Sequence, residues 1–251
     1  MAGRERRSMM TGAQAAHCGS VSAISLGLPV STAIPEAKGT LPKALFVGKA
    51  PISGKLKQRL VNEIESITML ALARSANTGL ADGKLIPEVL VIGLKLTAKA
   101  TGIPNEVIDL IAGQRKSGIV FVCVRDVPFE GSTREECAFA VRRAIPGRAG
   151  HTPIYQVYAG DWQPAGEAQL ELAGSTIDGL WASLCSQTIL GTPEVENLDA
   201  RIIRHTEIAR LESEVEKLTR DHQRVKNPAQ RNEIYAKLHK AKAQLAKLRE
   251  A

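Results

Sequence analysis

The sequence has few aromatic residues and few cysteines, and it has no long hydrophobic run. Phe, Trp and Tyr make up 4% of the 251 residues, which argues against a protein that stacks nucleic-acid bases on aromatic side chains. The four cysteines form no CxxC pair, so neither a zinc finger nor a disulfide framework is expected. No stretch reaches the roughly 18–20 apolar residues that cross a membrane. We expect a cytoplasmic protein with no membrane partner, whose thiols are small buried side chains.

The motifs of common catalytic sites are also missing. No GxGxxG or GxSxG pattern occurs, and GKAPISGK (48–55) has the wrong spacing for a P-loop. Leu56 stands where a P-loop has the Ser or Thr that binds magnesium. Between residues 41 and 199 the one histidine is His151, in the loop RAGHTP, which gives a serine hydrolase no orienting context. We therefore predict no catalytic residue, no cofactor and no metal site.

A metal-dependent nuclease is the alternative that the sequence leaves open. Such enzymes place an acid and a lysine two residues apart on a strand, with a further acid upstream, to hold the metal and orient water. The corresponding strand reads Ile92-Gly93-Leu94-Lys95, so Gly93 stands in the place of the carboxylate. Asp82 and Glu88 are nearby in sequence, but a lone acid is a weak ligand for magnesium. This hypothesis requires a degraded or relocated acidic site.

The positive charge of the chain is concentrated near its C-terminus. The formal net charge is +7, yet residues 41–199 contain 16 basic and 17 acidic side chains. Residues 200–251 contain 13 basic and 7 acidic side chains. The basic character therefore belongs to the last fifth of the chain, and not to its central body.

Hydrophobic periodicity predicts a compact domain in the middle of the chain. Residues 1–40 show little periodicity and are expected to form a flexible N-terminal arm. Apolar residues at three- to five-residue spacing predict a long helix from Ser53, its N-cap, to Arg74. The other predicted elements are strands at 86–96, 118–124, 136–144 and 153–162 and helices at 104–113 and 176–190. This order predicts an α/β (α+β) domain with a mixed sheet over residues 41–190 and a linker over residues 191–199.

The segment 200–251 has the clearest pattern in the sequence. Apolar residues recur at three- and four-residue spacing from Ile208 to Val225 and again from Ile234 to Leu248. Asn227-Pro228 interrupts the pattern, because Asn suits an N-cap and Pro suits the first position of a helix. Each arm alone has too few apolar residues to be stable in water. We predict an antiparallel coiled-coil αα-hairpin with arms of about 35 Å.

This predicted hairpin carries the basic residues that a phosphate backbone would attract. A basic helical hairpin can lie along duplex DNA and bind it in a salt-sensitive, sequence-independent way. The predicted nucleic-acid-binding residues are Arg220, Arg224, Lys226, Arg231, Lys237, Lys240, Lys242 and Lys247. Docking on another protein, contact with DNA, a solvated stalk, and self-association into a four-helix bundle all remain open.

The order of these segments resembles a bacterial family of unknown function, numbered 4391. The resemblance covers about residues 40–250 and rests on LPKALFVGKAPISGKLKQRLVNEIESI, VLVIGLKL, IPNEVIDLI, GIVFVCV, IYQVYAGDW, TIDGLWASL and the hairpin. Some relatives have a glutamate in the strand matching VLVIGLKL, where this chain has Gly93 or Leu94.

This resemblance implies a functional context. Similar proteins are encoded beside DNA helicases and DNA methyltransferases, in loci like those of antiphage (antiviral) defence or restriction–modification. Together with the basic hairpin, this context leads to the hypothesis of a non-catalytic accessory subunit that docks on a helicase or methyltransferase and contacts double-stranded DNA.

Overall fold

The computed structural model describes residues 14–48, 52–147 and 152–250. His151 and part of the P-loop-like segment lie outside these ranges. The described residues form two compact units. We term them the sheet unit (residues 14–145 and 152–195) and the hairpin unit (residues from 196 onward). The boundary between them lies within the segment 191–199.

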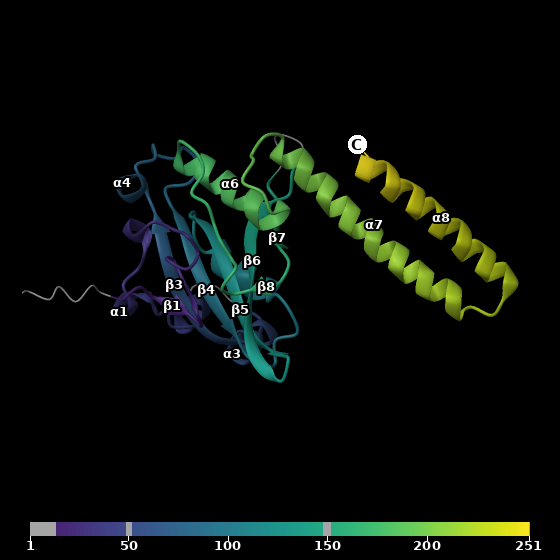
Figure 1. Ribbon diagram of the computed structural model, residues 1–251, viewed down its shortest axis with the longest axis horizontal. Coiled ribbons are helices and arrows are strands. Elements are labelled where there is room, and N and C mark those ends of the chain that lie inside the picture. The colour runs from purple at the N-terminus through teal and green to yellow at the C-terminus, as the bar shows by residue number, and fades with distance from the viewer. Residues whose placement is uncertain (1–13, 49–51, 148–151, 251) are drawn as a thin grey trace, which may run out of the picture. The chain divides into compact units, whose positions relative to one another are not determined.

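The sheet unit contains a six-stranded mixed sheet (Figure 1). Its strands are β3 (Ile64–Ala73), β4 (Val89–Leu96), β5 (Gly118–Phe129), β6 (Ser132–Ala144), β7 (Tyr155–Ala159) and β8 (Gln163–Pro164). The order is β3-β4-β5-β6-β7, with β8 also paired to β6. β4 and β5 run parallel, connected through helix α5 (Asn105–Gly113), whereas the other pairs are antiparallel. The predicted mixed-sheet α/β class is confirmed.

Helices cover both faces of this sheet. On one face, α3 (Gly54–Glu63) and α5 pack on a core that includes Ile92 and Phe121. On the opposite face lies α6 (Ile177–Leu190), which begins where Thr176 Oγ1 accepts a hydrogen bond from Gly179 N at 3.0 Å. Trp181 of α6 lies so close to β5 that a Cβ at Gly118 would meet its ring at 2.7 Å. The sheet is therefore a buried central layer.

Residues 14–40 differ from the flexible arm that the sequence predicts. They form β1 (His17–Cys18), β2 (Val21–Ser22), η1 (Val30–Thr32) and α1 (Glu36–Gly39). The side chains of Cys18, Val21 and Leu26 are fully buried. Further along, Ile34 N donates to Leu70 O at 3.0 Å and Leu41 N donates to Ile67 O at 2.8 Å, so this segment covers the outer edge of β3. Periodicity is weak here because these residues fill sites on an existing sheet instead of forming an apolar face of their own.

The predicted helix from Ser53 to Arg74 is wrong in its second half. Ser53 does cap α3, since its Oγ accepts a hydrogen bond from Leu56 N at 3.1 Å. The chain then becomes extended at Ile64 and forms β3. β3 has register shifts between Ile64 and Ser66 and between Met69 and Ala71. At each irregularity β3 has one extra residue, which interrupts the two-residue alternation of buried and exposed positions. The buried positions then recur every three or four residues, as they would in a helix.

The remaining predicted elements are present with shifted ends. β5 and β6 extend beyond their predicted ranges and meet at a turn where Glu130 and Gly131 have positive φ angles of 47° and 77°. Two further short helices, α2 (Ala44–Val47) and α4 (Ser75–Thr78), complete the sheet unit. The four cysteines are buried, and burial raises the pKa of Cys18 to about 12 and of Cys137 to about 11. None of the helices in the described ranges is long and apolar enough to cross a membrane.

The hairpin unit consists of two long helices. α7 (Leu198–Arg224) and α8 (Pro228–Glu250) lie side by side, joined by residues 225–227 (Figure 1). The helical hairpin that the sequence predicts is therefore present.

Candidate nucleic-acid interface

The turn between α7 and α8 fixes which faces of α8 point outward. Asn227 Oδ1 accepts hydrogen bonds from Ala229 N at 2.9 Å and Gln230 N at 3.3 Å, and Pro228 is the first residue of the helix. Beyond the turn, the two helices bury Leu211 against Ala241 and Leu245 in a small apolar core. Partly buried side chains extend this seam, namely Ile208, Val215, Leu218 and Leu248. Most residues of α8 outside this seam are exposed.

The predicted nucleic-acid-binding side chains are all exposed. They are Arg220, Arg224, Lys226, Arg231, Lys237, Lys240, Lys242 and Lys247. Arg220 lies 3.9 Å from Glu216, one turn earlier on α7. The other seven form no ion pair with any residue that the structure describes. Their charges are therefore available to an external anion.

These basic residues form more than one row on α8. Helical spacing places Lys237, Lys240 and Lys247 together on one side of α8. Lys237 lies at the margin of this side, next to buried Ala241, whereas Lys240 and Lys247 lie away from Leu238 and Leu245. A second row borders the buried seam and consists of Arg231, Lys242 and Arg249. Arg249 Nη2 lies 2.6 Å from Glu212 Oε1 of α7, so this row is partly neutralised. The outward row, which we call the lysine row, is the better phosphate contact.

Sequence reasoning missed two aromatic side chains beside the second row. Tyr235 is 57% exposed. Its ring centre lies 6.0 Å from that of His222 on α7 and 6.4 Å from that of His239 on α8. The four-residue spacing of Tyr235 and His239, off the apolar stripe, is the signal that could have identified them.

Two acids of α7 pair with an arginine of the same helix. Arg210 contacts Glu207 at 2.7 Å and Glu214 at 2.9 Å. The hydrogen bond from Arg210 holds the pKa of Glu207 below its ordinary value, so this acid stays charged and paired. In contrast, α8 has six basic side chains and two acids, Glu233 and Glu250. The unbalanced positive charge of the hairpin unit therefore lies on α8.

The nuclease alternative depends on Lys95, which the sheet places beside two carboxylates. Lys95 Nζ on β4 lies 2.8 Å from Asp126 Oδ1 on β5 and 2.7 Å from Glu135 Oε1 on β6. Burial lowers the pKa of Lys95, but these hydrogen bonds and charges outweigh it and hold the pKa above its ordinary value. Ser20 N also donates to Glu135 Oε2 at 2.7 Å. Lys95 is therefore a charged, paired lysine in the free protein.

The acids that the sequence placed near Lys95 lie elsewhere. Glu88 immediately precedes β4, about 20 Å from Lys95 along the strand, and pairs with Arg74. Asp82 accepts a hydrogen bond from Ser75. A Cβ at Gly93 would lie 2.4 Å from Cys18 Cβ, so residue 93 has no room for a carboxylate. Across the described ranges, no three acidic, His or Cys side chains are arranged to hold a metal ion.

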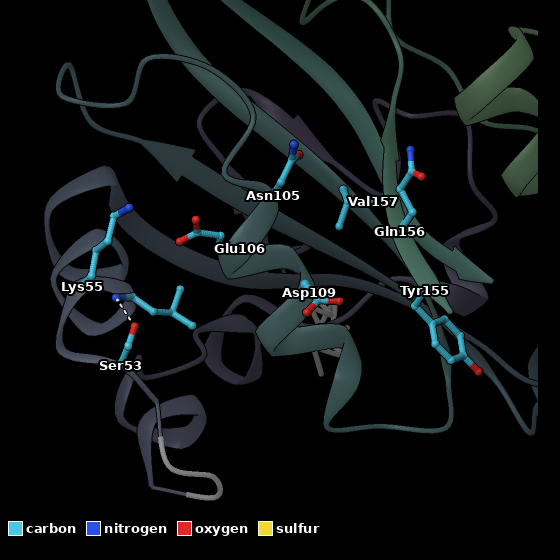
Figure 2. A pocket seen from close by; sticks show the side chains of 9 residues that line it. Ser53, Lys55, Asn105, Glu106, Asp109, Tyr155, Gln156 and Val157 are labelled. Atoms are coloured by element: carbon cyan, nitrogen blue, oxygen red, sulfur yellow. Dashed lines mark hydrogen bonds between the residues drawn. The ribbon is translucent and has the colours of Figure 1, made fainter. Parts of the chain in front are cut away.

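A shallow depression of about 650 Å³ lies between the first turn of α3, α5 and β7 (Figure 2). Lys55, Glu106 and Asp109 are among its lining residues. Arg59 contacts Glu106 at 3.1 Å, and Arg142 contacts Asp109 at 2.6 Å. Because neighbouring arginines already pair with both acids, the depression has no unmatched acidic group that would select a ligand.

Comparison with known proteins identifies a family and no individual relative. Comparison with curated proteins finds no match, and neither does comparison with solved structures. The sequence profile of one family, described as a domain of unknown function (DUF4391), matches residues 26–245, and the chain therefore belongs to that family.

Proposed function

We propose that this protein is a non-catalytic accessory subunit that binds the phosphate backbone of duplex DNA through its helical hairpin. The observation that carries the proposal is the set of seven exposed basic side chains that pair with no acid in the described ranges, five of them on α8. Each lysine that contacts a phosphate releases condensed counterions, which gives affinity without sequence specificity. The low aromatic content fits backbone contact better than base stacking.

The hairpin suits this role because it is a pre-formed support. We propose that α7 and α8 form an antiparallel coiled coil, since both helices contribute apolar residues at three- and four-residue spacing to one seam. An arm of 23 residues extends about 35 Å, or roughly ten base pairs of duplex. The lysine row of α8 would then follow one strand of the duplex.

Charge reversal on α8 tests the DNA contact. We expect the fourfold variant Lys237→Glu, Lys240→Glu, Lys242→Glu and Lys247→Glu to lose most duplex affinity, and to reduce the slope of log K against log salt by about 3. The matched control reverses four exposed lysines of the sheet unit instead: Lys38, Lys57, Lys84 and Lys99. Both variants have the same net charge. If they weaken binding equally, overall charge and not the hairpin accounts for the affinity.

The second part of the proposal is docking on a DNA helicase or a DNA methyltransferase, in the setting of bacterial antiphage defence or restriction–modification. It is supported by the resemblance to the family to which the chain belongs. The test is affinity capture from the native host after nuclease treatment, with wild type and the fourfold α8 variant side by side. We expect both to retain a helicase or a methyltransferase. If neither retains one, the accessory-subunit proposal is wrong.

A metal-dependent nuclease with a relocated acidic site is the second candidate. Its support is the contact of Asp126 and Glu135 with Lys95, which brings two carboxylates and a lysine together from three strands. This candidate predicts DNA cleavage with Mg²⁺ or Mn²⁺ that Lys95→Ala abolishes. Absence of cleavage of plasmid and phage DNA with either ion would remove it.

A further inference from the structure

One edge strand of the six-stranded sheet is covered by another segment of the chain, and the other edge strand is not. At the β3 edge, residues 33–41 run alongside the strand and form bridges at Ala33 with Ala71 and at Thr40 with Thr68. At the other edge, β7 pairs with β6, and no other described strand pairs with it. An uncovered edge strand offers a row of backbone N–H and C=O groups to another strand. β7 is therefore the edge at which the sheet can be extended.

The outward-facing groups of β7 follow from its hydrogen bonds to β6. Ile145 N donates to Ile154 O at 2.7 Å, and Gly160 N donates to Phe139 O at 3.0 Å. In an antiparallel ladder the bonded residues alternate, so Gln156 also directs its backbone groups toward β6. The backbone N–H and C=O of Tyr155, Val157 and Ala159 consequently point away from the sheet.

The side chains of this edge lack the features that usually block strand addition. Residues 154–159 read IYQVYA, with no charge, no proline and no β-bulge. Ile154 is 71% exposed and Tyr155 is 48% exposed. Isoleucine, tyrosine and valine also favour strand geometry. The segment is therefore suited to pairing and is left accessible.

We propose that β7 pairs antiparallel with β7 of a second copy of this chain, about a two-fold axis through Val157. In this register Tyr155 lies opposite Ala159 of the second copy, and Val157 lies opposite its own counterpart. The symmetry gives three such pairs, because Ala159 also lies opposite Tyr155 of the second copy. In each pair the backbone groups of both residues point away from β6, so each pair exchanges two hydrogen bonds, about six in total. The two sheets would become one continuous sheet through an isologous interface.

A second copy fits this edge because the register is self-complementary. Along β7, residues whose backbone N–H and C=O point away from β6 alternate with residues whose backbone groups bond to β6. A two-fold axis through Val157 sets each residue of the first kind opposite another of the same kind in the second copy. The same axis sets the large side chain of Tyr155 against the small one of Ala159, and exposed Ile154 against Gly160. β7 therefore supplies both halves of a matched interface.

The principal test is Ala159→Pro in the full-length protein. Ala159 is exposed and its N–H points away from β6, so proline removes no hydrogen bond within the sheet unit. In the dimer it removes one N–H donor from each copy. We expect a dimer by sedimentation equilibrium in the wild type, and dimerisation about thirtyfold weaker in the variant. Ala159→Ser keeps the N–H and is expected to dimerise like the wild type.

Cysteine crosslinking tests the register. Two residues paired on the axis have Cα atoms about 5.5 Å apart, within disulfide range. Val157→Cys is therefore expected to give covalent dimers under mild oxidation, and the native cysteines are buried and should contribute little. Gln156→Cys is the control, because residue 156 lies opposite residue 158 of the second copy.

Two results would overturn the proposal. One is a monomer at a concentration of about 100 µM, at which a dimer with a dissociation constant of about 1 µM would be mostly formed. The other is a dimer whose strength Ala159→Pro leaves unchanged, which would assign self-association to another surface such as the hairpin. Crosslinking of Gln156→Cys as fast as Val157→Cys would contradict the register.

Discussion

At the scale of single residues, Asn227 determines where α8 begins. Its side-chain oxygen accepts hydrogen bonds from two backbone N–H groups in the first turn, which would otherwise have no partner in the helix. We expect Asn227→Ala to destabilise the hairpin by about 1 kcal/mol, measured as loss of helical circular dichroism on heating. Asn232→Ala, in the exposed interior of α8, is the control and should stabilise the helix slightly. Equal effects of the two changes would contradict the capping role.

Lys95 contributes to stability through two carboxylates, and its contribution depends on pH. The Lys95 side chain is 13% exposed, so Lys95→Met leaves Glu135 with one hydrogen-bond partner fewer in a partly buried site. We expect the variant to be less stable at pH 7 by about 1–3 kcal/mol, measured by urea unfolding.

The sign of the pH dependence follows from Glu135. Burial raises the pKa of Glu135, but the hydrogen bonds from Lys95 and Ser20 outweigh it and hold the pKa below 4.5. The stability gained from this pairing is present above pH 4.5 and is lost as pH falls through the lowered pKa. The difference between wild type and Lys95→Met should therefore shrink below about pH 4. A difference that stays constant down to pH 3 would contradict an ionic role.

These two sites show which contacts a sequence reveals. The Asn227-Pro228 turn could be predicted because capping acts between residues two or three apart. The contact of Lys95 with Asp126 and Glu135 could not be predicted in the same way. It depends on the register of β4, β5 and β6, and residues more than 30 positions apart meet across that sheet.

At the scale of elements, the N-terminal segment packs closely on β4 because residue 93 is a glycine. Cys18 on β1 lies directly over Gly93, where any Cβ would approach it to 2.4 Å. We expect Gly93→Ala to destabilise the protein by about 1–3 kcal/mol, because the segment must shift to make room. Hydrogen exchange should show lost protection at residues 14–28, with β5 and β6 still protected. Unchanged protection of that segment would contradict this packing.

The element predictions failed where periodicity was ambiguous. Residues 64–73 have apolar spacing that fits a helix, yet they form β3, because its irregular register changes the strand period. Residues 14–40 have no periodicity and nevertheless pack on the sheet, because their buried residues complete a surface that other strands create. The strands that were predicted well, β4 and β5, are central and apolar on both faces.

At the scale of the whole molecule, positive charge and the open sheet edge belong to different units. The sheet unit contains β7, and the hairpin unit contains α8. Substitutions that share no packed core and no hydrogen-bond network generally act independently of one another. The proposed DNA contact and the proposed self-association should therefore be separable by mutation.

A double comparison of two variants makes this separation testable. On a duplex of about 12 base pairs, roughly the length of one hairpin arm, we expect Ala159→Pro to bind with the affinity and salt slope of the wild type. The fourfold α8 variant should in turn sediment as the wild-type dimer, because its substitutions leave β7 intact. If Ala159→Pro instead lowers the salt slope on the short duplex, the sheet edge takes part in the DNA contact. If the α8 variant loses the dimer, the hairpin is the self-association surface, and the β7 register must be abandoned.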